Sequence, residues 1–486
     1  MLMENLRFSL VVQKEAANMK SKIKNFVEEG RRKLPLEDGT VYSRRRGIQP
    51  FSVSPLQDYI PIVGEEKIEK LEKLARKLKG IRIMEVNSTM VGGGVAEMLY
   101  SQVPFLNELG IEDEWKVMHG TEAFYWVTKN IHNLLQGKKG TLTPEMVRRY
   151  YRTLKENADI YAKGHERYKP DMVIVHDPQP LGLARYLKGK NEKWLWRFHI
   201  DVEGDTLEAN PVLWQFITFW TSFYDAVMFS GAHYVVDSWP LRKYISPPFI
   251  DPLSIKNKEL KPDEITKVLE KYGIDQSIPL LVQIGRFDPW KGIDTTIKAY
   301  KIARKEERCQ LVVAGNMASD DPEGERIFNH VCEETRSDSG IHVIRLPDDL
   351  AVNALEVNAL QRAARVILQP STKEGFGLVI TEAMWKGKPV ITREVGAIPI
   401  QVRAGETGFF ITSAKKAARR IVYLLRNPEE AESVGREAHE YVKEHFLMPD
   451  RVADYLRVAN YFINDELDRD SIISYHPWFK LSQRRS

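Results

Sequence analysis

The segment Ser371–Gly387 constrains the fold of this chain more than any other. It follows the apolar run Val366–Leu368, which predicts a buried strand, and its two early glycines precede a helical pattern that Gly387 closes. A strand, a glycine turn and a helix N-terminus in that order form an anion site. The reason is that unpaired backbone N–H groups and the helix dipole both face the space above the turn.

Two glutamates of this segment indicate what the site would bind. Glu374 lies on the turn, and Glu382 lies eight residues later, about two turns into the predicted helix. A carboxylate that accepts two hydroxyl groups suits a sugar or a ribose, whereas the helix dipole suits a phosphate. A glycosidase acid and nucleophile pair is the alternative for these carboxylates. The anion-binding turn favours a phosphorylated donor.

Apolar runs of strand length alternate with segments of helical period along most of the chain. In the first half the predicted strands are Ile81–Asn87, Trp115–Met118, Met172–His176, Trp194–Ile200 and Ala226–Phe229. In the second half they are Leu280–Ile284, Gln310–Val313, His342–Ile344, Arg365–Leu368 and Pro389–Ile391. This alternation predicts α/β domains with parallel sheets and helices on both faces.

The composition along the chain predicts a sequence of segments with one domain boundary. In order these are a charged, mostly irregular or helical leader (1–80), an N-terminal Rossmann-like domain (81–250), a linker (251–262), a C-terminal Rossmann-like domain (263–445) and a helix with an aromatic tail (446–486). The leader ends in a predicted helix, Glu65–Lys79. The proline-rich stretch Ser246–Leu253 marks the boundary. After Gly408 the pattern is helical.

A second glycine turn in the C-terminal half carries two cations. Arg286 and Lys291 lie five residues apart on the loop that follows the strand ending at Ile284. A planar guanidinium and a compact ammonium together suit a diphosphate. Parallel strands would place this loop at the same sheet edge as Glu374. The alternative is a polar loop with two solvated cations.

The N-terminal half repeats this arrangement with smaller residues. Gly92, Gly93 and Gly94 follow the first predicted strand and precede a helix, so that a ligand could approach the backbone closely. The loop is neither a Walker A loop nor a G-x-G-x-x-G fingerprint. Tight packing of small residues is the alternative.

Polar side chains follow the next two strands of the first half. They are His176, Asp177, Gln179, His199 and Asp201. At the carboxyl ends of parallel strands they would face the cleft and offer donors and acceptors to sugar hydroxyls. A structural role is the alternative for the histidines. The run Trp194–Trp196 favours a core position over a sugar platform.

The overall composition argues against several classes of protein. The net charge of +4 is too small to indicate nucleic-acid binding. Cys309 and Cys332 form no disulfide framework and suit a reducing compartment. No apolar run approaches the roughly 20 residues of a membrane span, and no secretion signal is recognisable. No metal-ligand spacing and no G-x-S-x-G motif occur. We therefore expect a cytoplasmic protein.

These motifs resemble those of the retaining GT-B glycosyltransferases. Glu374–Glu382 resembles their paired-glutamate motif, and Gly285–Gly292 resembles their diphosphate loop. Over roughly residues 60 to 465 the chain resembles the trehalose glycosyltransferring synthases, which are related to the trehalose phosphorylases. The stretches that carry this closer likeness are Val86–Thr89, Gly92–Glu97, Val175–Pro180, His199–Asp201, Arg286–Gly292, Asp321–Gly324 and Glu382–Ile391.

The resemblance implies a fold and a role for each candidate residue. Two Rossmann-like domains would face each other across a cleft, with C-terminal helices returning to the N-terminal domain. Arg286 and Lys291 would hold the donor diphosphate and stabilise the leaving group, and Glu374 would bond the donor glucose. The other donor contacts would come from Glu382 (to the ribose), Gly377, Leu378, Gly93, Gly94 and His199. The acceptor contacts would come from His176, Asp177, Gln179 and Asp201.

The activity implied is reversible glucosyl transfer with retention, from UDP-, ADP- or GDP-glucose to glucose, giving α,α-trehalose. Neither a covalent intermediate, a metal nor another cofactor is implied. Three alternatives stay open: a trehalose phosphorylase, a transferase with another sugar acceptor, and a non-catalytic sugar- or nucleotide-binding protein. Expected partners are small molecules, not nucleic acid or a membrane. The leader and the aromatic tail are candidates for a homodimer contact.

Overall fold

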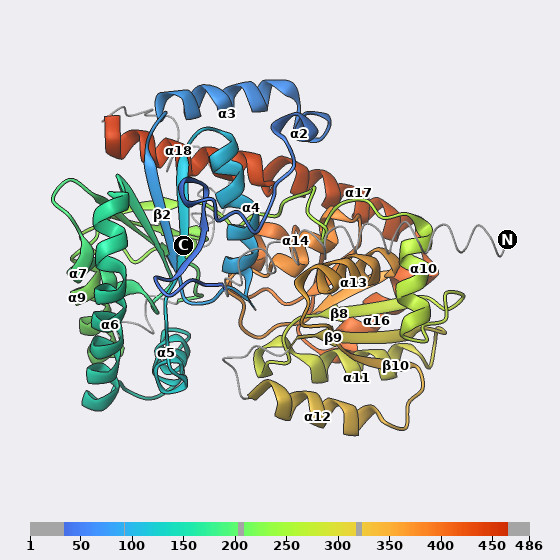
Figure 1. Ribbon diagram of the computed structural model, residues 1–486. Helices are drawn as coiled ribbons and strands as arrows, with labels where there is room; N and C mark the ends of the chain where they lie inside the picture. The colour runs from blue at the N-terminus through green and yellow to red at the C-terminus, as the bar shows by residue number, and fades with distance from the viewer. Residues whose placement is uncertain (1–33, 92, 203–208, 317–322, 465–486) are drawn as a thin grey trace.

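The computed structural model describes residues 34–91, 93–202, 209–316 and 323–464. Figure 1 shows two α/β domains side by side, the N-terminal one in blue to green and the C-terminal one in yellow to orange. Residues 1–33 of the leader, Gly92, part of the Asp321–Gly324 motif and the aromatic tail lie outside the described residues.

Within the residues that the structure describes, the N-terminal sheet has seven strands in the order β1-β3-β2-β4-β5-β6-β7. They are β1 (Thr40–Ser43), β2 (Arg82–Asn87), β3 (Glu112–Val117), β4 (Met172–His176), β5 (Lys193–Phe198), β6 (Ala226–Phe229) and β7 (Arg242–Ile245). All neighbours are parallel except β1, which runs antiparallel to β3. The five predicted strands are confirmed, and β1 and β7 were not predicted.

Helices cover both faces of this sheet. They are α2 (Leu56–Val63), α3 (Glu65–Lys77), α4 (Gly94–Glu108), α5 (Glu122–Leu135), α6 (Pro144–Tyr168), α7 (Ala184–Leu187) and α9 (Pro211–Thr221). Thr121 and Thr143 cap the N-termini of α5 and α6, because their hydroxyls accept hydrogen bonds from backbone N–H groups of the first turn. Trp194 and Trp196 are buried, which confirms their core position.

The C-terminal sheet, counted over the described ranges, has six parallel strands in the order β10-β9-β8-β11-β12-β13. They are β8 (Leu280–Ile284), β9 (Gln310–Gly315), β10 (Ile341–Arg345), β11 (Val366–Gln369), β12 (Val390–Thr392) and β13 (Gly408–Phe410). This is the doubly wound Rossmann order. The surrounding helices are α10 (Pro262–Lys271), α11 (Ile293–Ala303), α12 (Glu323–Thr335), α13 (Leu350–Ala363), α14 (Leu378–Trp385), α15 (Ile398–Gln401), α16 (Ala414–Arg426) and α17 (Pro428–His445).

Two expectations from the sequence need correction. The chain is not wholly helical after Gly408, because β13 adds an edge strand to the sheet beside β12. The leader is not merely irregular or helical, because β1 pairs with β3. Both segments are three or four residues long. At that length the hydrophobic period carries little information.

The last described helix, α18 (Met448–Asn464), returns to the N-terminal domain. Figure 1 shows it crossing between α3 and the N-terminal sheet. Val452 and Leu456 are fully buried in a cluster with Ile83 and Met172 of the sheet. The chain thus crosses between the domains twice. The expected return of the C-terminal end is confirmed.

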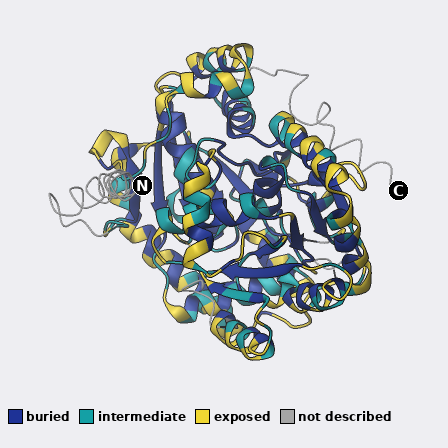
Figure 2. Ribbon diagram, turned by 90° about the vertical axis from the view of Figure 1, so that its right-hand side faces the viewer, coloured by how far each residue is buried: buried dark blue, intermediate teal, exposed yellow. Residues whose placement is uncertain are grey.

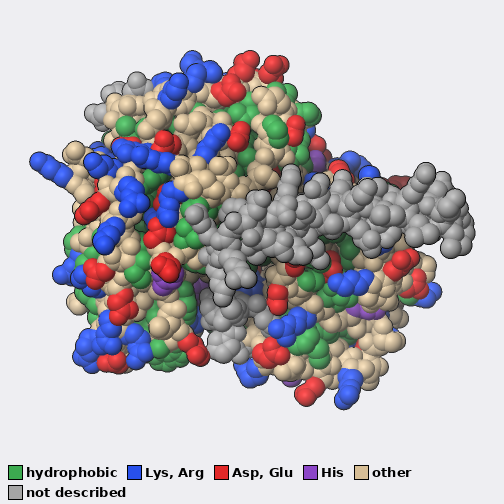
Figure 3. Space-filling view, in the orientation of Figure 1, with side chains coloured by type: hydrophobic (Ala, Val, Ile, Leu, Met, Phe, Trp, Pro, Cys, Tyr) green, Lys and Arg blue, Asp and Glu red, His purple; other side chains and the backbone are tan. Residues whose placement is uncertain are grey.

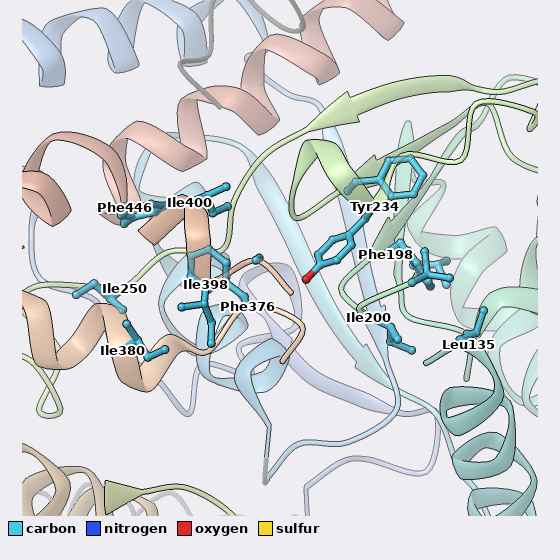
Figure 4. Close-up of a cluster of buried hydrophobic side chains, with 14 of the residues drawn as sticks. Leu135, Phe198, Ile200, Tyr234, Ile250, Phe376, Ile380, Ile398, Ile400 and Phe446 are labelled. Atoms are coloured by element: carbon cyan, nitrogen blue, oxygen red, sulfur yellow. The ribbon is translucent and has the colours of Figure 1, made fainter. Parts of the chain in front are cut away.

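Apolar packing also joins the two domains next to the cleft. In Figure 4, Phe198, Ile200 and Tyr234 of the N-terminal domain lie in one buried cluster with Phe376 and Ile398 of the C-terminal domain. Figure 2 shows that buried residues concentrate in the two sheets and on the helix faces that cover them. A shared apolar core thus joins the two domains.

The surface agrees with the modest net charge. On the face shown in Figure 3, basic and acidic side chains are interspersed. In the described part of the chain, no helix combines the length and the apolar composition that crossing a bilayer requires.

Candidate active site

The order of strands places the C-terminal site. In that sheet β8 and β11 are neighbours, and successive strands lead away from them in opposite directions. Ligands of open α/β sheets bind at such a reversal, beyond the carboxyl ends of the strands. The loop after β8 carries Arg286 and Lys291, and the loop after β11 carries Glu374. The structure thus brings together the two turns singled out in the sequence.

Lys291 and Glu374 form the centre of this site. The Lys291 ammonium lies 2.9 and 2.7 Å from the two carboxylate oxygens of Glu374. The hydroxyl of Ser371 donates to Oε2 of Glu374 over 3.0 Å. Glu374 is only 8% exposed. A buried carboxylate needs such partners, and this pair leaves one ammonium hydrogen of Lys291 for a further acceptor.

Arg286, on the same loop as Lys291, has a more open side chain, which is 40% exposed. Its guanidinium is 3.9 Å from the carboxylate of Asp288. Helix α5 of the opposite domain reaches the same loop, where the Lys129 ammonium is 4.0 Å from Asp288. Burial, followed by the charges of Lys129 and Arg286, lowers the pKa of His132 to about 4. Cations from both domains therefore lie around the carboxylate of Asp288 on this loop.

The N-termini of two helices, one from each domain, lie next to each other. Gly377 adopts a left-handed conformation (φ +88°) that admits glycine readily, and α14 begins directly after it at Leu378. Opposite, α4 begins at Gly94, and a Cβ on Gly94 would lie 3.1 Å from the Leu378 side chain. The positive ends of both helix dipoles are therefore close to each other.

Glu382 lies one turn into α14, not two as expected, because the helix begins only at Leu378. Its Oε1 pairs with the Lys256 ammonium at 3.0 Å. Lys256 comes from the linker between the domains and also contacts both carboxylate oxygens of Glu97 on α4 at 3.0 Å. Lys256 was not singled out from the sequence, because a lysine in a polar linker is ordinary.

In the N-terminal domain a buried chain of hydrogen bonds leads to His199. Oε2 of Glu85 is 2.6 Å from Nε2 of His176, and Nδ1 of His176 is 3.0 Å from Nε2 of His199. Gln102 donates to the other oxygen of Glu85 over 2.6 Å. Because a carboxylate accepts, it places a proton on Nε2 of His176 and fixes that ring. Burial, then the charges of Arg197 and His176, holds the pKa of His199 well below its ordinary value.

Glu85 was not among the residues singled out, although the sequence contains a sign of it. A charged residue inside the buried strand Arg82–Asn87 must have a partner, and Glu85 is fully buried there. Nothing in the sequence says that this partner is His176, because 91 residues separate them.

Asp177 follows β4 in a left-handed conformation (φ +62°), which is uncommon for a residue other than glycine. Its Oδ1 accepts a hydrogen bond of 2.9 Å from the backbone N–H of His199, and its carbonyl accepts one of 3.0 Å from Trp196. Burial raises the pKa of Asp177 from 3.8 to about 6, although the bond from His199 and the charges of His176 and Arg197 lower it. Asp177 thus holds the backbone of His199 in place.

This pKa predicts a pH-dependent stability that Asp177→Asn should remove. Folding raises the pKa of Asp177, so the folded state binds its proton more tightly than the unfolded state. The resulting contribution to the free energy of unfolding is fully present below about pH 4 and is lost as the pH rises through about 6. Asparagine keeps an oxygen acceptor for His199 without the charge. The free energy of unfolding in urea is expected to rise by about 2 kcal/mol at pH 8 and to stay unchanged at pH 4.

The control for this experiment is Asp237→Asn, at an exposed position of the same domain. It should leave the free energy of unfolding nearly constant at both pH values. Equal effects of Asp177→Asn at pH 4 and pH 8 would contradict the raised pKa.

The remaining candidates of the N-terminal domain, Gln179 and Asp201, follow the carboxyl ends of β4 and β5. Asp201 is buried, and its backbone nitrogen would lie 3.8 Å from a Cβ on Gly375 of the opposite domain. Gln179 is half-buried, and its Oε1 has no hydrogen-bond partner among the described residues. The hydroxyl of Tyr234 donates to the carbonyls of Glu374 and Gly375 over 3.2 and 2.9 Å. Tyr234, which the sequence did not suggest, therefore ties the two halves of the site together, and Figure 4 shows its hydroxyl directed at the Phe376 side.

Metal-ligand geometry occurs at one place among the described residues. Asp294, His330 and Glu334 could bring ligand atoms within 4.8 Å of one another, but all three are exposed. Exposed acidic groups commonly lie this close without a metal.

Two Rossmann-like domains, with glycine turns at the strand reversal of the C-terminal sheet, define a GT-B glycosyltransferase. A solved α,α-trehalose-phosphate synthase (UDP-forming) from Burkholderia xenovorans, in complex with glucose-6-phosphate, has this fold. It superimposes with a TM-score of 0.64 at 13% identity, covering 78% of this chain and 100% of that chain. At this identity the likeness shows the fold alone.

Sequence comparison narrows the class to a family. The N-terminal domain model of trehalose synthase matches residues 85–236, and that of glycosyl transferases group 1 matches residues 264–441. The trehalose synthase of Pyrococcus horikoshii is 44% identical over 408 residues, which is 83% of this chain and 96% of that protein. The chain therefore belongs to the trehalose synthase family. The resemblance seen in the motifs is confirmed, and the chain is an enzyme of the glycosyltransferase class.

More distant relatives include phosphorylases. The trehalose phosphorylase of Pleurotus pulmonarius is 28% identical over 408 residues, which is 74% of this chain but only 54% of that protein.

Proposed function

We propose that this enzyme transfers a glucosyl group from a nucleoside-diphosphate glucose to glucose, with retention, and forms α,α-trehalose reversibly. The observation that carries the proposal is the constellation at the start of α14. Lys291 pairs with Glu374, Arg286 lies on the same loop as Lys291, and Glu382 keeps a buried carboxylate oxygen without a partner among the described residues. Cations for a diphosphate and an acceptor for ribose hydroxyls thus lie along one helix end.

In this proposal the donor spans the α14 turn. Arg286, Lys291 and the backbone N–H groups of Gly377 and Leu378 bind the diphosphate, and Glu382 accepts the ribose hydroxyls. Glu374 faces the glucose of the donor and orients Lys291. No metal or other cofactor takes part, since the two cations and the helix dipole stabilise the negative charge of the leaving group.

The transfer step needs no nucleophile from the protein. The anomeric hydroxyl oxygen of the acceptor glucose forms a bond to C1 of the donor glucose, on the face from which the diphosphate leaves. The C1–O bond to phosphate breaks with its electron pair, and the hydroxyl proton passes to the leaving diphosphate. His199, Gly93 and Gly94 would contact the donor side, while His176, Asp177, Gln179 and Asp201 would surround the acceptor.

Exclusion of water supports transfer over hydrolysis of the donor. Tyr234 joins the domains through its hydrogen bonds to Glu374 and Gly375. The shared apolar cluster of Figure 4, which includes Tyr234 and Phe376, lies next to these bonds. The two sugars would thus react in a closed space, where holding them in position replaces a bimolecular encounter.

Product analysis tests the proposal. The purified protein is incubated with glucose and ADP-, UDP- or GDP-glucose, without added metal, and the disaccharide is identified by NMR. The expected product has both anomeric linkages α. Release of free glucose from the donor without disaccharide would overturn the proposed acceptor.

A trehalose phosphorylase is the second candidate, favoured by the similarity to phosphorylases and by an anion site that could bind free phosphate. The protein is incubated with trehalose and phosphate, and separately with trehalose and a nucleoside diphosphate. Glucose 1-phosphate from the first mixture, with no reaction in the second, would replace the proposed function by the phosphorylase.

A further inference from the structure

Hydrogen bonds attach residues 251–257 of the linker to both domains. Asp251, at its start, accepts hydrogen bonds from Tyr59 and Ser101 of the N-terminal domain over 3.1 and 3.0 Å. The backbone carbonyl of Asn257 accepts bonds of 3.2 and 3.1 Å from Trp385 and from the guanidinium of Arg362, both in the C-terminal domain. Residue 256 is therefore held at a fixed place between the two helix N-termini.

From this position the side chain of Lys256 contacts both domains. Its ammonium lies 3.0 Å from Oε1 of Glu382 on α14 and 3.0 Å from each carboxylate oxygen of Glu97 on α4. The Lys256 side chain is 20% exposed and that of Glu382 only 2%. Burial alone would lower the pKa of Lys256, but the carboxylates of Glu382 and Glu97 outweigh it and raise the pKa, so the group is cationic.

This contact leaves Glu382 with one occupied and one free oxygen. Oε1 faces Lys256, whereas Oε2 is buried and has no hydrogen-bond partner within the described ranges. A buried carboxylate oxygen without a donor is costly. A ligand with hydroxyl groups would supply the missing donors. Lys256 fixes which oxygen is available.

We propose that Lys256 is a specificity-determining residue for the ribose of the donor: it orients Glu382 so that Oε2 accepts the ribose hydroxyls. The inference rests on the proposed function, which places a nucleoside diphosphate at the start of α14. Lys256 touches Glu382, and the carboxylate of Glu382 in turn bonds the ribose. Without the ammonium, the like charges of Glu97 and Glu382 would repel each other, and nothing would hold Oε1 of Glu382 in its present direction.

Binding measurements by calorimetry test this inference without turnover. ADP, UDP and GDP, their 2′,3′-dideoxy forms and inorganic pyrophosphate are titrated into the wild type and Lys256→Met. The variant is expected to bind the preferred nucleoside diphosphate at least tenfold more weakly and to lose discrimination against the dideoxy form. Pyrophosphate, held by Arg286 and Lys291, should bind within about twofold of the wild type. Lys256→Arg should recover part of the discrimination.

The matched control is Lys258→Met, an exposed lysine two positions along the same linker, which should behave as the wild type. Undiminished ribose discrimination by Lys256→Met would overturn the inference. A loss of pyrophosphate binding would do so too, since it would mean that Lys256 supports the whole cleft. If the wild type binds pyrophosphate but no nucleoside diphosphate, the proposed function itself fails. If the wild type discriminates against the dideoxy form and Lys256→Met does not, but the wild type forms no trehalose, the inference stands and only the proposed acceptor is removed.

Discussion

Replacing Lys291 by alanine is expected to lower kcat/KM for glucosyl transfer at least a hundredfold. Its ammonium lies 2.9 and 2.7 Å from the two oxygens of Glu374 and is only 17% exposed. In the proposed mechanism the substitution removes a cation from the leaving diphosphate, a loss of about 3–4 kcal/mol in a water-excluded site. It also leaves the buried carboxylate of Glu374 without its counter-charge. Initial rates of nucleoside diphosphate release would measure the effect.

The comparison for this variant is Lys298→Ala, at an exposed lysine of α11, which should keep the rate of the wild type. Arg286→Ala is expected to cost about tenfold or more, because one charge-assisted contact contributes roughly 1.5–3 kcal/mol. A rate for Lys291→Ala within fivefold of the wild type would refute the assignment of the diphosphate clamp.

Gly375→Ala should also reduce kcat/KM about a hundredfold, because it changes the distance between the two domains at the site. A Cβ at this position would lie 2.6 Å from the carbonyl oxygen of His199, closer than real Cβ atoms approach backbone. The two groups belong to opposite domains, so we expect the clash to shift the two halves of the site relative to each other. A displacement of about 1 Å between reacting groups can cost a hundredfold in rate.

Kinetics and thermal unfolding together test this second variant. The expected result is a low kcat with an almost unchanged unfolding temperature. Gly164→Ala on α6 is the control, because the nearest heavy atom to its Cβ would be the Lys116 ammonium at an ordinary 3.6 Å. Normal turnover by Gly375→Ala would show that the contact with His199 does not need to be kept during the reaction.

The chain alone predicted the long elements well and the short edges poorly. Strands such as Met172–His176 and Leu280–Ile284 carry continuous apolar runs, because helices bury both faces of a parallel sheet. The edge strands β1, β7 and β13 were missed. They are three or four residues long, and their place in a sheet is decided by pairing with distant strands.

The same distinction applies to the site. The sequence by itself determined the two glycine turns, the cations at Arg286 and Lys291 and the glutamates at 374 and 382, because a turn between a strand and a helix is a local structure. Only the tertiary structure decided that Glu85 orients His176, that Tyr234 donates to the carbonyl of Glu374 and that Lys256 pairs with a carboxylate of each domain. Those contacts join residues 91 and 140 positions apart, or a linker to both domains, and no local pattern specifies which distant group will satisfy a buried charge.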